Sequence, residues 1–306
     1  MASATAKEGS GGALNMALFY VFVVIFVLAS VLPLVWVFKM SIVTKSELYA
    51  SPPTILPHTP NTAKYAQIFG DSTFQRALLN STIIASVTTV ICLLFGSVTA
   101  YAIARLRFHF KATVMTLILA ISFFPAVAII APLFMQYTQL GLINTYASVI
   151  ITDVVFALPL TIWLLVAFFR ELPRDLEDAA KVDGATTLQA FRKVIVPLAA
   201  PGVFTTAILT FIYAWNEFLF ANTFLFDQST QPVTVVIPNF ATIYTVDYGA
   251  QAAAAVVLFC RAWPMASLRS WKSTGLVRCA EKPASRLWRM SVSMPKPLKA
   301  TPRSPY

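Results

Sequence analysis

The stretch RELPRDLEDAAKVDGATTLQAFRKVIVP, residues 170–197, is a charged segment between two long apolar runs. Pro173 suits the first turn of a helix, and the acids within 175–178 stand where the dipole of a helix N-terminus favours negative charge. Gly184 can end this helix, because glycine readily adopts the left-handed conformation that follows a helix. The pattern predicts one short helix that stops at Gly184 and a second that stops at Pro197.

The second short helix has one apolar face. Thr186 or Thr187 can cap its start. Apolar residues then recur at three- and four-residue spacing and form a ridge on one side: Leu188, Phe191, Val194 and Ile195. Such a ridge fits either the groove of a partner protein or the headgroup region of a membrane, and the periodicity favours neither.

The composition is that of a membrane protein. Of the 306 residues, 58% are hydrophobic and 12% charged, and the mean hydropathy is +0.71, which excludes a soluble helical protein of this size. Crossing a bilayer takes ~20 helical residues. Runs of that length lie near 16–38, 78–104, 112–135, 147–169 and 199–221, and three prolines inside them predict kinks: Pro125, Pro132 and Pro159. With a last candidate run that begins near 249, the sequence predicts an all-α, multi-pass integral membrane helical bundle with six transmembrane helices.

The positively charged loops predict the orientation of these helices. Lys and Arg are frequent in the connections 105–111 and 170–197 and absent from 136–146 and 222–248. Since basic residues favour the cytoplasmic side, the first two connections are predicted inside and the last two outside. Residues 1–15 then form a cytoplasmic N-terminal tail. The connection 39–77 falls outside although it carries basic residues: Lys39, Lys45, Lys64 and Arg76.

The C-terminal part departs from the rest of the chain. Residues 261–306 hold ten of the 23 Lys+Arg and one of the 13 Asp+Glu. The sixth apolar run begins near 249 and breaks off at Arg261, too early to cross a bilayer. We therefore expect the transmembrane domain to occupy 16–260, with a truncated or frame-shifted sixth helix and a basic irregular tail over 261–306. The alternative is a genuine basic tail that contacts anionic lipid.

Three segments carry a resemblance to a known family. DAAKVDGA, residues 178–185, followed by VIVP, residues 194–197, resembles the EAA loop of binding-protein-dependent ABC-transporter permeases, with Asp178 where the family has Glu. Residues 48–80 and the string WNEFL, residues 215–219, resemble the carbohydrate-uptake permeases of the maltose type. The likeness runs from about residue 16 to residue 258.

The resemblance implies a permease subunit of an ABC importer for sugars in the inner (plasma) membrane of a prokaryote. Such a subunit is not an enzyme: it forms half of the translocation pathway. Its expected partners are a second permease subunit, a cytoplasmic ATPase dimer, an external sugar-binding protein and membrane lipid, with no nucleic acid. ATP and Mg would bind the ATPase, because this chain has no G-x-x-x-x-G-K-[ST] loop and needs no cofactor of its own.

The resemblance also assigns the contact with the ATPase to the segment 170–197. The residues that match the motif or lie just after it are Asp178, Ala179, Ala180, Asp183, Gly184, Ala185, Phe191 and Pro197. Closure of the ATPase dimer would push on this coupling segment, and Gly184 would set the bend between its two helices.

Two places could line the substrate pathway. Asp153 lies inside the run 147–169, where an acid costs ~2.5–3.5 kcal/mol on insertion scales. It could bond sugar hydroxyls, or it could face a polar seam or be paired within the bundle. Asn216 and Glu217, at the outer end of the fifth run, could contact substrate or the binding protein, or serve the structure.

Other readings of the chain are weaker. An ion-coupled secondary transporter is disfavoured because the spans hold only Asp153 and Glu217 and no internal repeat. A non-functional, frame-shifted permease relative is the other alternative. No metal site is expected, because the cysteines and the two histidines have no ligand spacing.

Overall fold

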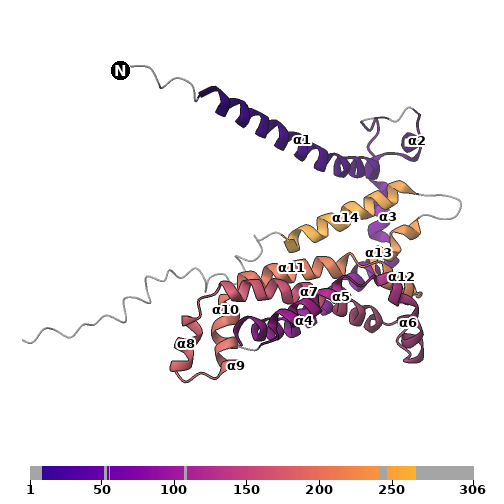
Figure 1. The fold of residues 1–306 in the computed structure, drawn as a ribbon. Helices are drawn as coiled ribbons and strands as arrows, with labels where there is room; N and C mark the ends of the chain where they lie inside the picture. The colour runs from indigo at the N-terminus through magenta and orange to yellow at the C-terminus, as the bar shows by residue number, and fades with distance from the viewer. Residues whose placement is uncertain (1–8, 52–53, 55, 107–108, 241–246, 267–306) are drawn as a thin grey trace, which may run out of the picture. The chain divides into compact units, whose positions relative to one another are not determined.

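The computed structural model describes residues 9–51, 54, 56–106, 109–240 and 247–266, and the regular structure within them is helical (Figure 1). The first half holds α1 (Gly9–Ile42), α2 (Lys45–Leu48), α3 (Ala63–Gly70), α4 (Ser72–Arg105), α5 (Lys111–Ser122), α6 (Ala126–Gln139) and α7 (Tyr146–Glu171). The second half holds α8 (Asp175–Val182), α9 (Thr187–Ala190), the π-helical η1 (Phe191–Ile195), α10 (Val196–Leu198), α11 (Ala200–Trp215), α12 (Leu219–Phe224), α13 (Val233–Val236), the 3₁₀ turn η2 (Pro238–Phe240) and α14 (Tyr248–Ala266). The prediction of an all-α protein is confirmed.

By length and apolar composition, three helices of the described residues can cross a bilayer, or five if each of two bent helix pairs is one span. The three single helices lie in α1, α4 and α7. The bent pairs are α5 with α6 at 82°, and the segment Thr187–Leu198 with α11 at 77°. Pro125 stands at the α5–α6 break as the N-cap of α6, so the run 112–135 is two helices rather than one. Pro132 and Pro159 lie inside α6 and α7.

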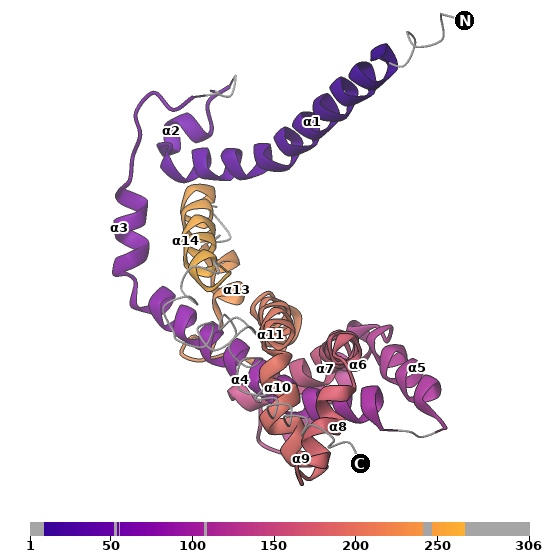
Figure 2. The same cartoon turned by 90° about the vertical axis from the view of Figure 1, so that its left-hand side faces the viewer.

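The core of the bundle is formed by α4, α7 and α11, which lie side by side (Figure 2). Small residues permit the close approach of these helices. A Cβ at Gly96 on α4 would meet Thr161 Cγ2 of α7 at 3.0 Å. Gly202 on α11 is packed still more tightly, against the ring of Phe168.

The first helix is longer than the run 16–38 that predicts it. It begins at Gly9, so the later part of the predicted N-terminal tail is helical, while residues 1–8 lie outside the described part. None of its most apolar window is buried, and Phe22 is 66% exposed. A helix that is apolar on all sides needs lipid or another apolar surface around it.

The last helix runs past the boundary that the sequence predicts. α14 continues through Arg261 to Ala266. Its described apolar part, Tyr248–Leu258, is shorter than the ~20 residues that cross a bilayer, as the sequence indicates. The rest of the predicted tail, 267–306, lies outside the described residues.

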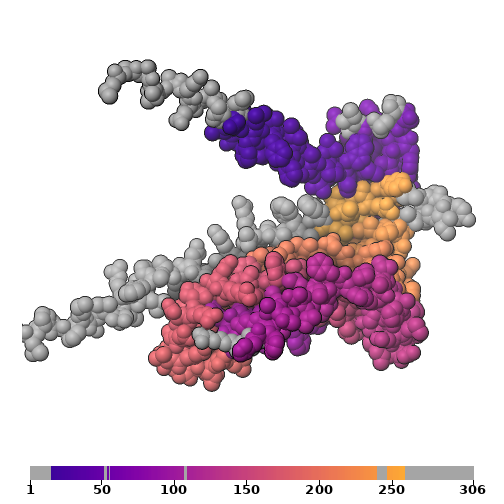
Figure 3. All heavy atoms as spheres, viewed as in Figure 1, coloured from indigo at the N-terminus to yellow at the C-terminus, as the bar shows by residue number. Residues whose placement is uncertain are grey.

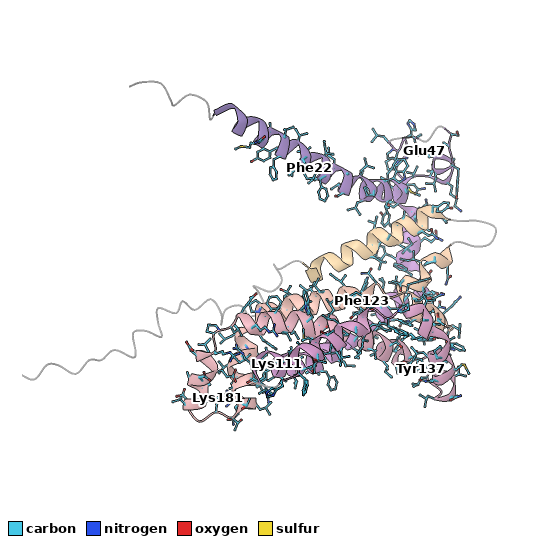
Figure 4. The ribbon with its side chains drawn as sticks, viewed as in Figure 1. Phe22, Glu47, Lys111, Phe123, Tyr137 and Lys181 are labelled. Atoms are coloured by element: carbon cyan, nitrogen blue, oxygen red, sulfur yellow. The ribbon has the colours of Figure 1, made fainter. Side chains whose placement is uncertain are left out.

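The two connections predicted to be cytoplasmic lie at the same end of the bundle. Figure 4 shows Lys111, at the start of α5, and Lys181, in α8, toward one end and Tyr137, in α6, toward the other. A cluster that joins the ends of α4 and α7 to η1 also contacts Val114 and Ile118 of α5. This arrangement agrees with the relative sides that the charged loops predict.

Candidate functional site

The coupling segment folds as two helices with a tight turn between them. α8 begins at Asp175 with three acids in its first turn, where the helix dipole favours them. It ends in a Schellman motif: the Gly184 amide donates to the Lys181 carbonyl and the Ala185 amide to the Ala180 carbonyl, both at 3.0 Å. Gly184 has φ +85°, the left-handed conformation that the sequence predicts for it.

The start of the second helix is fixed by a capping box. Thr186 Oγ1 accepts from the Gln189 amide at 3.3 Å, and Gln189 Oε1 accepts from the Thr186 amide at 2.9 Å. Of the two threonines that the sequence allows as the cap, the structure therefore selects Thr186. The turn between the helices is defined on both sides by local hydrogen bonds.

The coupling segment lies at the surface of the molecule (Figure 3), and most of its motif residues are exposed. Asp178, Ala179, Asp183 and Gly184 are exposed, Ala180 and Ala185 are half-buried, and Pro197 is exposed in α10. Two large apolar side chains flank the turn, Val182 at 88% and Leu188 at 71% exposure. The segment therefore offers acids and unburied apolar groups together.

The predicted apolar ridge does not form a single outward face. Leu188 points to the surface, but Phe191 and Ile195 are buried against the ends of α4 and α7. The ring of Phe191 lies 4.6 Å from that of Tyr101 and 6.2 Å from that of Phe169, measured between centroids. Phe191 anchors the segment to the bundle, because burial against the core outweighs the local amphipathic pattern.

Glu177 is a site residue that the sequence did not single out. It is buried in the first turn of α8, where Tyr101 Oη donates to its Oε1 at 2.8 Å. Lys181 Nζ lies 2.8 Å from Oε1, and Arg105 Nε lies 3.6 Å from Oε2. Its spacing to Lys181 is a recognisable i, i+4 pair, but the contacts with α4 have no sequence signal.

These contacts set the ionisation of Glu177. Burial acts to raise the pKa of the carboxyl, but its three partners outweigh that effect and the net pKa lies below the ordinary value. The stability that this carboxylate contributes is therefore present above the ordinary glutamate pKa of about 4.3 and is lost as the pH falls through the lower folded-state value. Near neutral pH the group is therefore ionised.

A second polar feature lies in the membrane part, along the seam between α4, α7 and α11. The hydroxyls of Thr161 and Thr210 pair at 2.9 Å across this seam. Asp153 is 1% exposed, and within the described residues neither of its carboxylate oxygens has a hydrogen-bond partner. Thr88 Oγ1 is likewise buried without a hydrogen-bond partner among the described residues. The idea that Asp153 is paired within the bundle is therefore not supported by the described contacts.

Glu217 performs a structural task at the outer end of α11. Its Oε1 accepts from the Phe220 amide at 2.7 Å and its Oε2 from the Ala221 amide at 2.9 Å, so it caps α12. It also lines a small pocket with Val149 and Trp215. Asn216 is exposed and donates to the Ile212 carbonyl of its own helix at 2.8 Å.

Glu217→Gln is expected to lower the thermal stability of the purified protein. A glutamine keeps one side-chain oxygen and loses the other, so one of the two amides of α12 loses its acceptor, at a cost of about 1–2 kcal/mol. Asn216→Ala is the matched control, because Asn216 bonds only within its own helix turn and is exposed. Equal melting temperatures for Glu217→Gln and the unaltered protein would contradict the capping role assigned to Glu217.

The apolar bundle, its bent spans and the exposed two-helix segment at one end define a polytopic membrane protein of the transporter class. The chain belongs to the family of binding-protein-dependent transport system inner membrane components, whose sequence pattern matches residues 92–262. Members of this family are transport components embedded in a prokaryotic membrane, not enzymes. The resemblance carried by the EAA loop is confirmed.

Relatives and a solved structure agree with this assignment. The chain is 42% identical over 231 residues to the trehalose transport system permease protein SugB of Mycobacterium tuberculosis, covering 75% of this chain and 84% of that protein. It is 39% identical over 238 residues to the sulfoquinovosyl glycerol transport system permease protein SmoH of Agrobacterium fabrum, covering 76% and 84%. A bacterial ABC transporter involved in the import of the acidic polysaccharide alginate has the same fold, with TM-score 0.71 and 22% identity over 86% of this chain and 98% of that chain.

Proposed function

We propose that this chain is the permease subunit of an ABC importer for small carbohydrates and that it couples to a separate ATPase through α8 and α9. The exposed segment around Gly184 is the observation that carries the proposal. A soluble partner can reach this segment, and it presents acids beside unburied apolar groups. The relatives are named for trehalose and sulfoquinovosyl glycerol, so the substrate class is a small glycoside.

The partners follow from this role. A second permease subunit completes the pathway, an ATPase dimer binds ATP and Mg and contacts α8–α9, and an external binding protein delivers the sugar. Lipid surrounds the spans, nucleic acid has no part, and this chain holds no cofactor. The N-terminus and the coupling segment are on the cytoplasmic side, in line with the basic connections.

Two chain connections join the coupling segment to helices in the membrane. α8 follows directly from the end of α7, and α9–α10 continue into α11 through the 77° bend. A push on the coupling segment therefore reaches both helices and opens or closes the seam against α4. In this proposal Asp153 becomes an acceptor for a sugar hydroxyl when the seam opens, and Asn216 and Glu217 lie near its outer end.

ATP-driven uptake tests the proposal. The chain, its co-encoded permease, ATPase and binding protein are reconstituted in proteoliposomes, and uptake of labelled trehalose and maltose is measured. We expect uptake that requires internal ATP, survives a protonophore and falls at least tenfold in Asp178→Lys, which reverses an exposed charge of the coupling segment. Uptake driven by a proton or sodium gradient without ATP would instead support a secondary transporter.

A further inference from the structure

We infer that Glu177 is a positioning residue that transmits the movement of the coupling segment to α4. The inference rests on the proposed function, in which α8 and α9 contact an ATPase. It concerns α4, the core helix that is not joined to the coupling segment by a direct chain connection. α7 and α11 are continuous with the coupling segment, whereas α4 ends at Arg105, far from α8 in the chain. Movement can pass to α4 only through side-chain contacts.

Within the described residues, two polar contacts from α4 to α8 meet at this carboxylate. Tyr101 Oη donates to Glu177 Oε1 at 2.8 Å, and Arg105 Nε lies 3.6 Å from Oε2. The same Arg105 donates from Nη2 to the Leu172 carbonyl at 2.9 Å, just before α8. Two side chains one turn apart on α4 therefore hold both the entry to α8 and its first turn.

Tyr101 contacts the coupling segment on both sides of its turn, in α8 and in η1. Its hydroxyl bonds to Glu177 in α8, and its ring packs 4.6 Å from the ring of Phe191 in η1. Movement of α8 or η1 displaces this one side chain. The group is shielded from water, with Glu177, Tyr101 and Arg105 between 6% and 9% exposed. A buried, charge-assisted contact of this kind has little freedom to slip, because separating α4 from α8 leaves the buried guanidinium of Arg105 without its carboxylate partner.

The test uses the whole transporter in proteoliposomes with Glu177→Gln and Tyr101→Phe. Each change keeps the shape of the side chain and removes the charge or the hydroxyl. Asp227→Asn controls for loss of an exposed acid away from the coupling segment, and Tyr20→Phe controls for loss of an exposed hydroxyl. Three quantities are measured: co-purification of the ATPase, ATP hydrolysed per sugar transported, and the nucleotide-dependent distance between spin labels at Val98 on α4 and Leu209 on α11, both exposed.

We expect Glu177→Gln to keep the ATPase bound and to raise the ATP hydrolysed per sugar at least fivefold, with a smaller rise for Tyr101→Phe. The nucleotide-dependent change in the Val98–Leu209 distance should shrink in both variants and persist in both controls. Unchanged ratios and distances would overturn the inference. Loss of the ATPase from both variants would also overturn it, because Glu177 and Tyr101 would then serve docking or folding rather than transmission of movement. Failure of the unaltered complex to couple ATP to uptake would instead overturn the proposed function.

Discussion

Gly184→Val should uncouple ATP hydrolysis from transport, lowering uptake at least tenfold while the chain stays in the membrane. Gly184 has φ +85°, and a Cβ there would meet nothing within 4 Å. The effect of valine is therefore one of backbone conformation alone, since the left-handed region costs an L-residue about 1–2 kcal/mol and a β-branched one more. The turn between α8 and α9 would change shape, and the acids beside it would no longer face the ATPase together.

Gly141 provides a matched control for this experiment. It follows α6 in the same Schellman motif, with φ +67° and open space where its Cβ would lie, but at the other end of the bundle. Gly141→Val imposes the same kind of strain away from the coupling segment and should leave the ratio of ATP hydrolysed to sugar transported unchanged. Gly184→Asn should retain most transport, because asparagine tolerates the left-handed conformation. Transport at the unaltered rate by Gly184→Val would contradict the assigned role of this turn.

The coupling segment could be predicted in detail because its signals are local. The acids of the first turn, the glycine that ends α8 and the threonine that caps α9 all act within a few residues of themselves. The structure confirms the first short helix and the turn after it, and it chooses Thr186 over Thr187 as the cap. The second helix does not stop at Pro197: it passes from α9 through the π-helical η1 into α10, which contains Pro197 and ends at Leu198. Local hydrogen bonds fix this geometry, and a sequence pattern can express them.

The contacts across the bundle could not be predicted in the same way. Glu177 meets Tyr101 across 76 positions, and Asn80 donates to the Ser229 carbonyl across 149. Phe191 was expected on an exposed ridge because periodicity identifies an apolar face but not what covers it. Burial against the ends of α4 and α7 decided its position.

For the membrane spans too, local features could be predicted from the sequence and long-range packing could not. The positions of the long apolar helices follow from hydropathy, since a bilayer demands such helices. The described residues hold three to five candidate spans rather than the six expected. Pro125 predicts a bend between α5 and α6, but not its angle of 82°. A proline indicates that hydrogen bonds are lost, but neighbouring helices set the angle that results.

Gly202→Ala should destabilise the packing of α7 against α11. A Cβ at Gly202 would lie 2.4 Å from Cγ of Phe168 and 2.8 Å from its Cβ. Turning the ring away cannot relieve the second contact, because the Cβ of Phe168 is fixed by the α7 backbone. The helices α7 and α11 must separate, and overpacking of this kind costs about 1–3 kcal/mol. We expect a lower yield of monodisperse protein and a melting temperature lower by several degrees in detergent.

Gly70→Ala separates this effect from the ordinary consequence of replacing glycine. Gly70 ends α3, is exposed, has no left-handed φ, and a Cβ there meets nothing within 4 Å. Alanine usually stabilises such a position by up to about 1 kcal/mol, because it restricts the unfolded chain. The two substitutions add the same methyl group and should act on the melting temperature with opposite signs.

Because Gly202 lies just past the bend where the coupling segment enters α11, loss of stability there should be accompanied by loss of uptake. If Gly202→Ala melts and transports as the unaltered protein does, α7 and α11 do not pack at this point, and the route from the coupling segment into the seam must run elsewhere.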